Sequence, residues 1–263
     1  MLAFIVSACA VKQKSTQTEA VEMLPFSKLT VTGKLDNGMN YYIIQNKMPV
    51  DKIELRLNVR SASLNETEEE RGLAHFVEHM AFNGTKNFSG NELVRFLEEA
   101  GLSFGHHSNA YTSFGNTNYM LSVPAADKSL LEQSFVILRD WADGVTFDED
   151  EIEKEKGVIT EEWRTRNESW YRLSLKARNE MYAGSRYTER EPIGLMEVVA
   201  GANKKLLKGY YDRWYTAGNM SVVVAGNIEV EEAKALIEKH FNTVEKRTSP
   251  NQADDTRHCV SAL

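Results

Sequence analysis

The feature that most constrains this chain is a pair of histidines in the apolar segment 72–84, GLAHFVEHMAFNG. His75 and His79 are four residues apart, so on a helix both side chains project from one face, a single turn apart. Glu78 leans over the same face. Zinc binds neutral imidazole nitrogens, and the carboxylate is placed to take a proton from a metal-bound water. The segment predicts a helical metal site with His75 and His79 as ligands and Glu78 as general base.

The alternative is that these histidines are hydrogen-bonded core residues on an apolar helix. A lone histidine in such a helix would favour that interpretation. Here three ligating or basic side chains converge between residues 75 and 79, beside an apolar wall. Such clusters are typical of functional sites, so we favour the metal site.

A catalytic zinc ion also needs a third protein ligand and an open position. The acid-rich segment 148–163 is the best source, and its acids favour a helix that begins there. Glu155 and Glu162 share a face of that helix, but two turns, about 10 Å, separate them, so only one can bind the metal. Acid-rich helices are usually solvated, so the spacing alone does not choose between them. The apolar positions that we expect to be buried are Ile152, Val158, Ile159 and Trp163.

These segments resemble the pitrilysin/insulinase-type zinc peptidases, called inverzincins for their His-x-x-Glu-His order, which include the mitochondrial processing peptidases. The resemblance runs from about Leu29 to Phe241. It rests on residues 72–80, 109–112 (Asn-Ala-Tyr-Thr), 155–162, 209–215 and 219–226. It implies that zinc is the cofactor and that Glu162 is the third ligand. It also implies that Glu155 lies behind the ligands and keeps them oriented.

Residues 109–112 and 118–123 are predicted to form two strands. Ordinary sheet packing would explain both. The resemblance implies instead an edge strand whose backbone pairs with an extended peptide substrate, with Asn109, Ala110 and Tyr111 as the substrate-binding residues. The adjacent pair His106 and His107 is not expected to hold one metal ion, because neighbouring strand residues face opposite sides.

The remaining periodicities predict the fold class. Segments 30–35 and 40–44 flank Asp36-Asn37-Gly38, a hairpin signal, and residues 53–59 alternate as a half-buried strand does. Residues 220–226 form an apolar run suited to a sheet centre. Helices are expected over 89–101, 130–141, 148–183 with a break near Asn167, 195–199, 204–214 and 230–241. This order predicts an α+β two-layer sandwich, a largely antiparallel sheet with helices on one face. The tryptophans are expected to be core residues: Trp141, Trp163, Trp170 and Trp214.

The first 26 residues are predicted to be a lipoprotein signal and tether. Val6-Ser7-Ala8-Cys9 resembles a bacterial lipoprotein cleavage box, in which Cys9 becomes lipidated, and the polar residues 12–19 suit a tether. No basic residue precedes Lys12, so a merely apolar start is the alternative. The expected location is the bacterial cell envelope, as a periplasmic or membrane-anchored lipoprotein. The other cysteine, Cys259, gives no disulfide framework.

Residues 27–246 are predicted to be a zinc peptidase N-terminal domain and 247–263 a linker or truncated tail. The family's enzymes close two halves, each of two such domains, around a chamber. Missing C-terminal domains or a partner subunit are therefore expected to complete the activity. With 31 basic and 38 acidic residues, the net charge of −7 argues against a nucleic-acid partner. The sequence predicts a zinc endopeptidase domain for extended peptides, with a noncatalytic homologue or peptide-binding subunit as the alternative.

Overall fold

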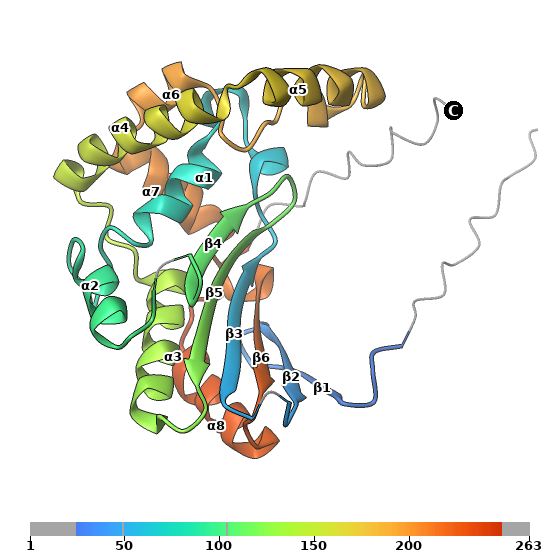
Figure 1. Cartoon of the computed structure of the whole chain (residues 1–263), viewed down its shortest axis with the longest axis vertical. Helices are drawn as coiled ribbons and strands as arrows, with labels where there is room; N and C mark the ends of the chain where they lie inside the picture. Colours follow the sequence, from blue (N-terminus) through green and yellow to red (C-terminus); the bar gives the residue numbers. More distant parts are fainter. Residues whose placement is uncertain (1–24, 49, 104, 249–263) are drawn as a thin grey trace, which may run out of the picture.

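The strands of the chain form one mixed sheet in the computed structural model, which describes residues 25–48, 50–103 and 105–248 (Figure 1). The strand order is β1-β2-β6-β3-β5-β4. The strands are β1 (Thr30–Lys34), β2 (Asn40–Gln45), β3 (Lys52–Val59), β4 (Ser108–Thr112), β5 (Thr117–Pro124) and β6 (Met220–Gly226). β2 and β6 run parallel, and the other neighbouring pairs of the described strands are antiparallel. The predicted largely antiparallel sheet is confirmed.

Local turn chemistry and burial explain how the sheet is built. Gly38, at φ 95°, allows the turn between β1 and β2, and its amide donates to the Leu35 carbonyl at 2.8 Å. β6 is distant in sequence, yet it lies between β2 and β3, where Val224 is opposite Ile43 and Leu55. β6 has hydrogen-bonded strands on both of its edges, and its residues that face the helices, Met220, Val222 and Val224, are buried.

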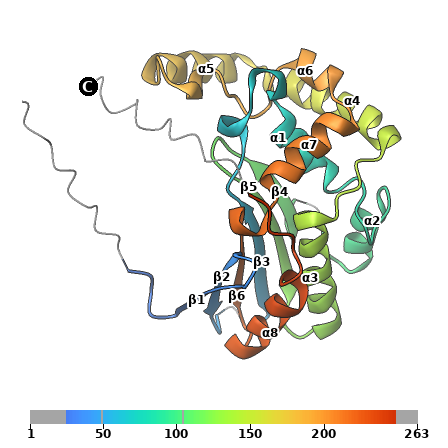
Figure 2. The ribbon, with the colours of Figure 1, turned by 180° about the vertical axis from the view of Figure 1, so that it is seen from behind.

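The helices cover one face of the sheet, as Figures 1 and 2 show from opposite sides. α3 packs on β3 and β5, α8 packs on β2, and α1 packs on β4 and β5. Along β3, the residues that face the helices are buried, whereas those on the other face are partly or fully exposed. The predicted two-layer α+β sandwich is confirmed. The helices are α1 (Leu73–Met80), α2 (Glu92–Glu99), α3 (Lys128–Asp143), α4 (Glu149–Arg166), α5 (Ser169–Met181), α6 (Met196–Gly201), α7 (Lys204–Trp214) and α8 (Val230–Phe241).

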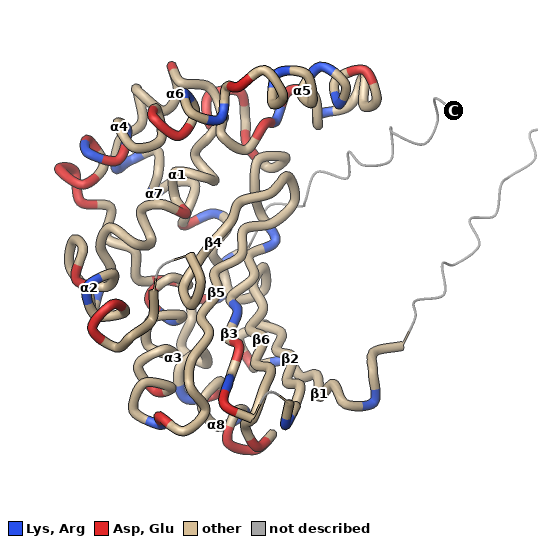
Figure 3. Tube along the Cα trace, in the orientation of Figure 1, with Lys and Arg blue, Asp and Glu red and all other residues tan. Residues whose placement is uncertain are grey.

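The acid-rich helical segment breaks where the sequence predicts, because α4 ends at Arg166 and α5 begins at Ser169. Acidic and basic residues are interspersed along both helices (Figure 3). On α4 they form ion pairs three residues apart, such as Lys154 with Glu151 and Arg164 with Glu161. Such exposed pairs add little stability; the helix is held by its buried side.

Three predicted core positions need correction: Val158, Trp163 and Trp170. Trp141 and Trp214 are buried, but Trp163 is 38% and Trp170 77% exposed. On α4, Ile152 and Ile159 are buried as predicted, whereas Val158 is 51% exposed. The inward face of α4 follows residues 152, 155, 159 and 162, so Val158 and Trp163 fall at its edges. α5 has no buried residue among those described, which leaves Trp170 in contact with solvent.

The predicted lipidation site Cys9, the tether and most of the predicted tail lie outside the described residues. Within the described part of the chain, no helix combines the length and the apolar character that a bilayer crossing requires.

Candidate metal centre

Helix α1 begins in a tightly packed and polar setting. Gly72 precedes it at φ 108°, and a Cβ on Gly194 would lie 2.3 Å from the Gly72 Cα atom, so the two backbones touch. The helix has no side-chain cap from its own N-cap residue. Instead the oxygens of the buried carboxyl group of Glu66 accept hydrogen bonds from the backbone amides of Gly72, at 3.0 Å, and Ala74, at 2.8 Å. These contacts satisfy first-turn amides and fix the start of the helix.

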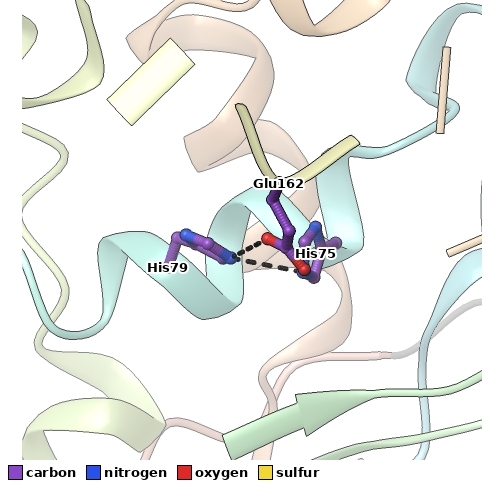
Figure 4. A group of neighbouring side chains, drawn as sticks. All are labelled: His75, His79 and Glu162. Atoms are coloured by element: carbon purple, nitrogen blue, oxygen red, sulfur yellow. Dashed lines mark hydrogen bonds and ion pairs between the residues drawn. The ribbon is translucent and has the colours of Figure 1, made fainter. Parts of the chain in front are cut away.

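The predicted ligands converge at the face of α1 that meets α4. His75 and His79 come from α1 and Glu162 comes from α4, and Figure 4 shows the three side chains pointing toward one another. The His79 Nε2 atom lies 3.2 Å from His75 Nε2 and 3.3 Å from a Glu162 oxygen. The other Glu162 oxygen lies 3.6 Å from His75 Nε2. One potential ligand atom from each residue therefore faces a common point.

Glu155, two helical turns before Glu162 on α4, contacts the opposite side of His79. Its Oε1 atom lies 2.6 Å from His79 Nδ1, and its Oε2 atom accepts a hydrogen bond from the Asn83 side-chain amide at 2.5 Å. A carboxylate only accepts, so this contact places a proton on Nδ1 and turns the Nε2 atom toward the site. The geometry thus gives the two glutamates different positions, which spacing alone could not do.

Glu78 does not join the three converging side chains. Its Oε2 atom accepts a hydrogen bond from the Thr112 hydroxyl, on β4, at 2.5 Å. Burial raises the pKa of Glu78, and the Thr112 hydrogen bond opposes that rise. A carboxylate with a raised pKa beside a metal site suits proton transfer near neutral pH.

Burial and neighbouring charges separate the pKa values of the site. Burial, with the nearby His79, lowers the pKa of His75 to about 3, which keeps its imidazole neutral. Burial also lowers the pKa of His79, but hydrogen bonds to Glu155 and Glu162 outweigh it and raise the value to about 9. Burial would raise the pKa of Glu162, yet the His79 hydrogen bond and the electrostatic attraction of nearby basic groups, Arg166 among them, lower it to about 2. Without a metal, the acids therefore hold a proton on His79.

The three side chains fit a zinc ion. Their potential ligand atoms, two imidazole nitrogens and a carboxylate oxygen, lie within 4.8 Å of one another. This donor set and the neutral His75 match a catalytic zinc site, and so does the carboxylate behind His79. A cation would also take the place of the proton that His79 holds.

A cavity of about 470 Å³ lies beside these residues, between α1, α2, α4 and β4. Phe82, Val94 and Val158 give it an apolar wall. Of the three predicted substrate-binding residues, Asn109 and Ala110 line the cavity. The Tyr111 hydroxyl instead accepts a hydrogen bond from the Asn118 side chain at 3.0 Å. β4 is the terminal strand of the described sheet, as predicted.

The sequence reasoning missed two residues that contact the site, Asn83 and Thr112, and one that holds the start of α1, Glu66. Asn83 follows His79 by four residues, the spacing of a helix face, and this signal could have identified it. Thr112 belongs to the Asn-Ala-Tyr-Thr segment, but its contact with Glu78 depends on how β4 packs against α1. Nothing in the sequence distinguishes Glu66 from the other acidic residues of the loop that precedes α1.

A sequence model of the insulinase peptidases (peptidase family M16) matches residues 41–191, more than half of the chain. The chain belongs to the insulinase family of peptidases. A model of the peptidase M16 inactive domain matches residues 202–259. In the structure both matches contribute to one sheet, since β6 of the second lies between β2 and β3 of the first.

Relatives in the insulinase family support this assignment. The chain is 41% identical over 238 residues to the "probable zinc protease PqqL" of Escherichia coli K12 and 36% identical over 221 residues to a zinc protease PQQL-like protein of Arabidopsis thaliana. These alignments cover 88% and 84% of this chain, but 26% and 23% of the relatives. The chain thus spans about a quarter of their length.

Solved structures of proteases have a fold similar to that of this chain. The crystal structure of the periplasmic protease PqqL from Escherichia coli matches with a TM-score of 0.86 and 40% identity, over 88% of this chain and 26% of that one. A mutant of the ferredoxin protease FusC, in complex with Arabidopsis ferredoxin, matches with a TM-score of 0.79 and 27% identity, over 86% of this chain and 25% of that one. Both have the fold of this insulinase-family chain.

Proposed function

We propose that this chain is the catalytic domain of a zinc-dependent endopeptidase that hydrolyses extended peptides. His75, His79 and Glu162 hold the zinc ion, Glu78 is the general base, and Glu155 orients His79. The observation that carries the proposal is the convergence of the two Nε2 atoms and the Glu162 carboxylate, with Glu78 beside them. Membership of a peptidase family supports it independently.

Zinc, when bound, supplies a Lewis acid that lowers the pKa of a water and polarises the scissile carbonyl. The chain's own residues then handle the protons. Glu78 takes a proton from the attacking water and returns it to the leaving amine nitrogen, which balances the hydrolysis. Thr112 holds one oxygen of this carboxylate, so the other oxygen is left to exchange the proton.

The substrate lies along β4 in this proposal. A terminal strand has one side free of strand partners, so an extended peptide can pair with its backbone. Asn109 and Ala110 face the cavity next to Glu78 and His79, which brings the peptide close to the reacting groups. Tyr111 stands further along the same strand and contacts the peptide outside the cavity.

The proposal also includes additional domains or a partner subunit and a location in the cell envelope. The relatives are about four times longer, so we expect C-terminal domains or a partner subunit to supply additional substrate contacts. The similarity to a periplasmic protease supports a periplasmic location. Attachment to the membrane through a lipidated Cys9 remains a prediction from the sequence.

The decisive experiment compares metal content with peptide cleavage. Native mass spectrometry of the purified chain should give one zinc per chain, lost in His79→Ala and weakened in Glu162→Gln. Cleavage of unstructured fluorogenic peptides should fall by about 10²-fold or more in Glu78→Gln, while its zinc content stays unchanged.

Two outcomes would contradict the proposal. Equal turnover in Glu78→Gln would refute the role of Glu78 as general base. A folded chain that binds zinc and captures peptides without cleaving them would support the peptide-binding alternative instead. Glu99→Gln, on the exposed side of α2, is the control for removal of a carboxylate.

A further inference from the structure

Asn83 lies just beyond the end of α1, in a turn that continues from the helix. Its backbone amide donates to the Met80 carbonyl at 3.1 Å, and its side chain is half-buried at the edge of the cavity. Neither zinc binding nor proton transfer, as argued above, uses this side chain. Within the part of the chain that the structure describes, its side-chain amide donates to Glu155.

That hydrogen bond engages the Glu155 oxygen that His79 leaves free. Oε1 of Glu155 contacts His79 Nδ1 and Oε2 accepts from Asn83, so both carboxylate oxygens have partners. A carboxylate held at one oxygen can still rotate about its last bond. A carboxylate that is held at both oxygens, as Glu155 is, presents Oε1 to the His79 imidazole in a single orientation. Asn83 therefore limits the rotation of His79 through Glu155.

The site depends on this support from one side. Among the described residues, the buried Nδ1 atom of His75 has no hydrogen-bond partner. Of the two Nδ1 atoms, the one of His79 is therefore the one that has a protein partner, the Glu155 carboxylate. Loss of the Glu155 orientation would leave both imidazoles without a polar anchor behind them.

The turn that carries Asn83 is itself anchored. The buried carboxylate of Asp140, on α3, accepts hydrogen bonds from the Thr85 hydroxyl at 2.6 Å and from the Asn87 backbone and side-chain amides at 2.9 and 2.8 Å. The Thr146 amide donates to the Gly84 carbonyl at 3.1 Å. Since α3 packs on the sheet, the turn presents the Asn83 amide at a fixed place.

We propose that Asn83 is a positioning residue of the metal centre, which acts on His79 through Glu155. The inference rests on the zinc site of the proposed function and extends it to a side chain outside the helix. Groups behind metal ligands typically contribute 10–100-fold to metal affinity, on the order of one or two powers of ten.

The test is a double-mutant cycle on zinc affinity in the full chain, measured by competition with a chromophoric chelator. Asn83→Leu keeps a side chain that branches at Cγ and removes the donor, and it should weaken zinc binding by about tenfold. In a Glu155→Ala background the same substitution should have no further effect, because the residue through which it acts is gone. Asn91→Leu, at an exposed asparagine of the following connection, should bind zinc like the parent chain.

Three outcomes would overturn the inference. Unchanged zinc affinity in Asn83→Leu would do so, and so would an equal loss in the presence and absence of Glu155. If circular dichroism shows that Asn83→Leu unfolds the metal-free chain, the cycle is repeated with Asn83→Ser. A change in zinc affinity in Asn83→Ser that is the same with and without Glu155 would also overturn the inference. If the parent chain binds no zinc, or binds it equally in His79→Ala, the proposed function fails and the inference falls with it.

Discussion

We expect the buried carboxyl group of Glu66 to make the stability of this domain depend on pH. Glu66 is 1% exposed, and it accepts hydrogen bonds from the first-turn amides of α1. Burial raises its pKa from 4.5 to about 8, although the hydrogen bonds from Ala74 and Gly72 oppose that rise. Between pH 4.5 and about pH 8, the folded chain therefore holds a proton on Glu66 that the unfolded chain has lost. Stability from this group is fully present below pH 4.5 and is lost as the pH rises through 8.

The magnitude follows from that difference in pKa. Each pH unit in this window costs at most about 1.4 kcal/mol, which sums to roughly 3 kcal/mol of unfolding free energy between pH 5 and pH 8. Glu66→Gln has nearly the same shape and does not titrate. We expect the difference in unfolding free energy between Glu66→Gln and the parent chain to shift by roughly 3 kcal/mol in favour of the variant over that range.

The assay is urea unfolding followed by circular dichroism, with a chelator present so that both proteins are metal-free. The titrations of other groups contribute equally to the unfolding free energies of the two proteins, so they cancel when one is subtracted from the other. If the introduced glutamine side chain forms poorer hydrogen bonds than Glu66, the variant loses the same free energy at every pH, and the pH dependence is unchanged. Glu99→Gln should show no such dependence. Parallel stability curves for Glu66→Gln and the parent chain would refute the argument that Glu66 is protonated in the folded state.

Two further predictions concern the same helix. Gly194→Ala places a Cβ atom 2.3 Å from the Gly72 Cα atom at a residue with φ 75°, so we expect a loss of about 1–3 kcal/mol and a lower thermal unfolding midpoint; an unchanged midpoint would contradict the close approach of these backbones. In the proposed site, zinc would displace the proton that His79 holds with a pKa of about 9, so apparent zinc affinity should fall by up to about tenfold for each unit of pH below that pKa. Chelator competition from pH 6 to pH 8 measures this, and a flat profile would exclude proton displacement.

Much of the fold could be predicted because the signals are local. The hairpin around Gly38, the alternation along β3 and the break after Arg166 each depend on a few neighbouring residues. Dihedral preferences and the 2.0 and 3.6 residue periods act over that range. The exposure of Trp163 and Trp170 was missed because it depends on which face of α4 meets α1 and on α5 standing clear of the sheet.

The sequence by itself determined the pairing of His75 with His79, since a spacing of four on a helix sets both side chains on one face whatever surrounds them. Only the tertiary structure decided how Glu162 and Glu155 divide their contacts. It also brought Asn83 and Thr112 to the site and Glu66 to the start of α1. The physical reason is that these contacts depend on the angle and distance at which α4, β4 and the loop before α1 pack against α1. Packing of that kind arises from the whole core, and no short stretch of sequence encodes it.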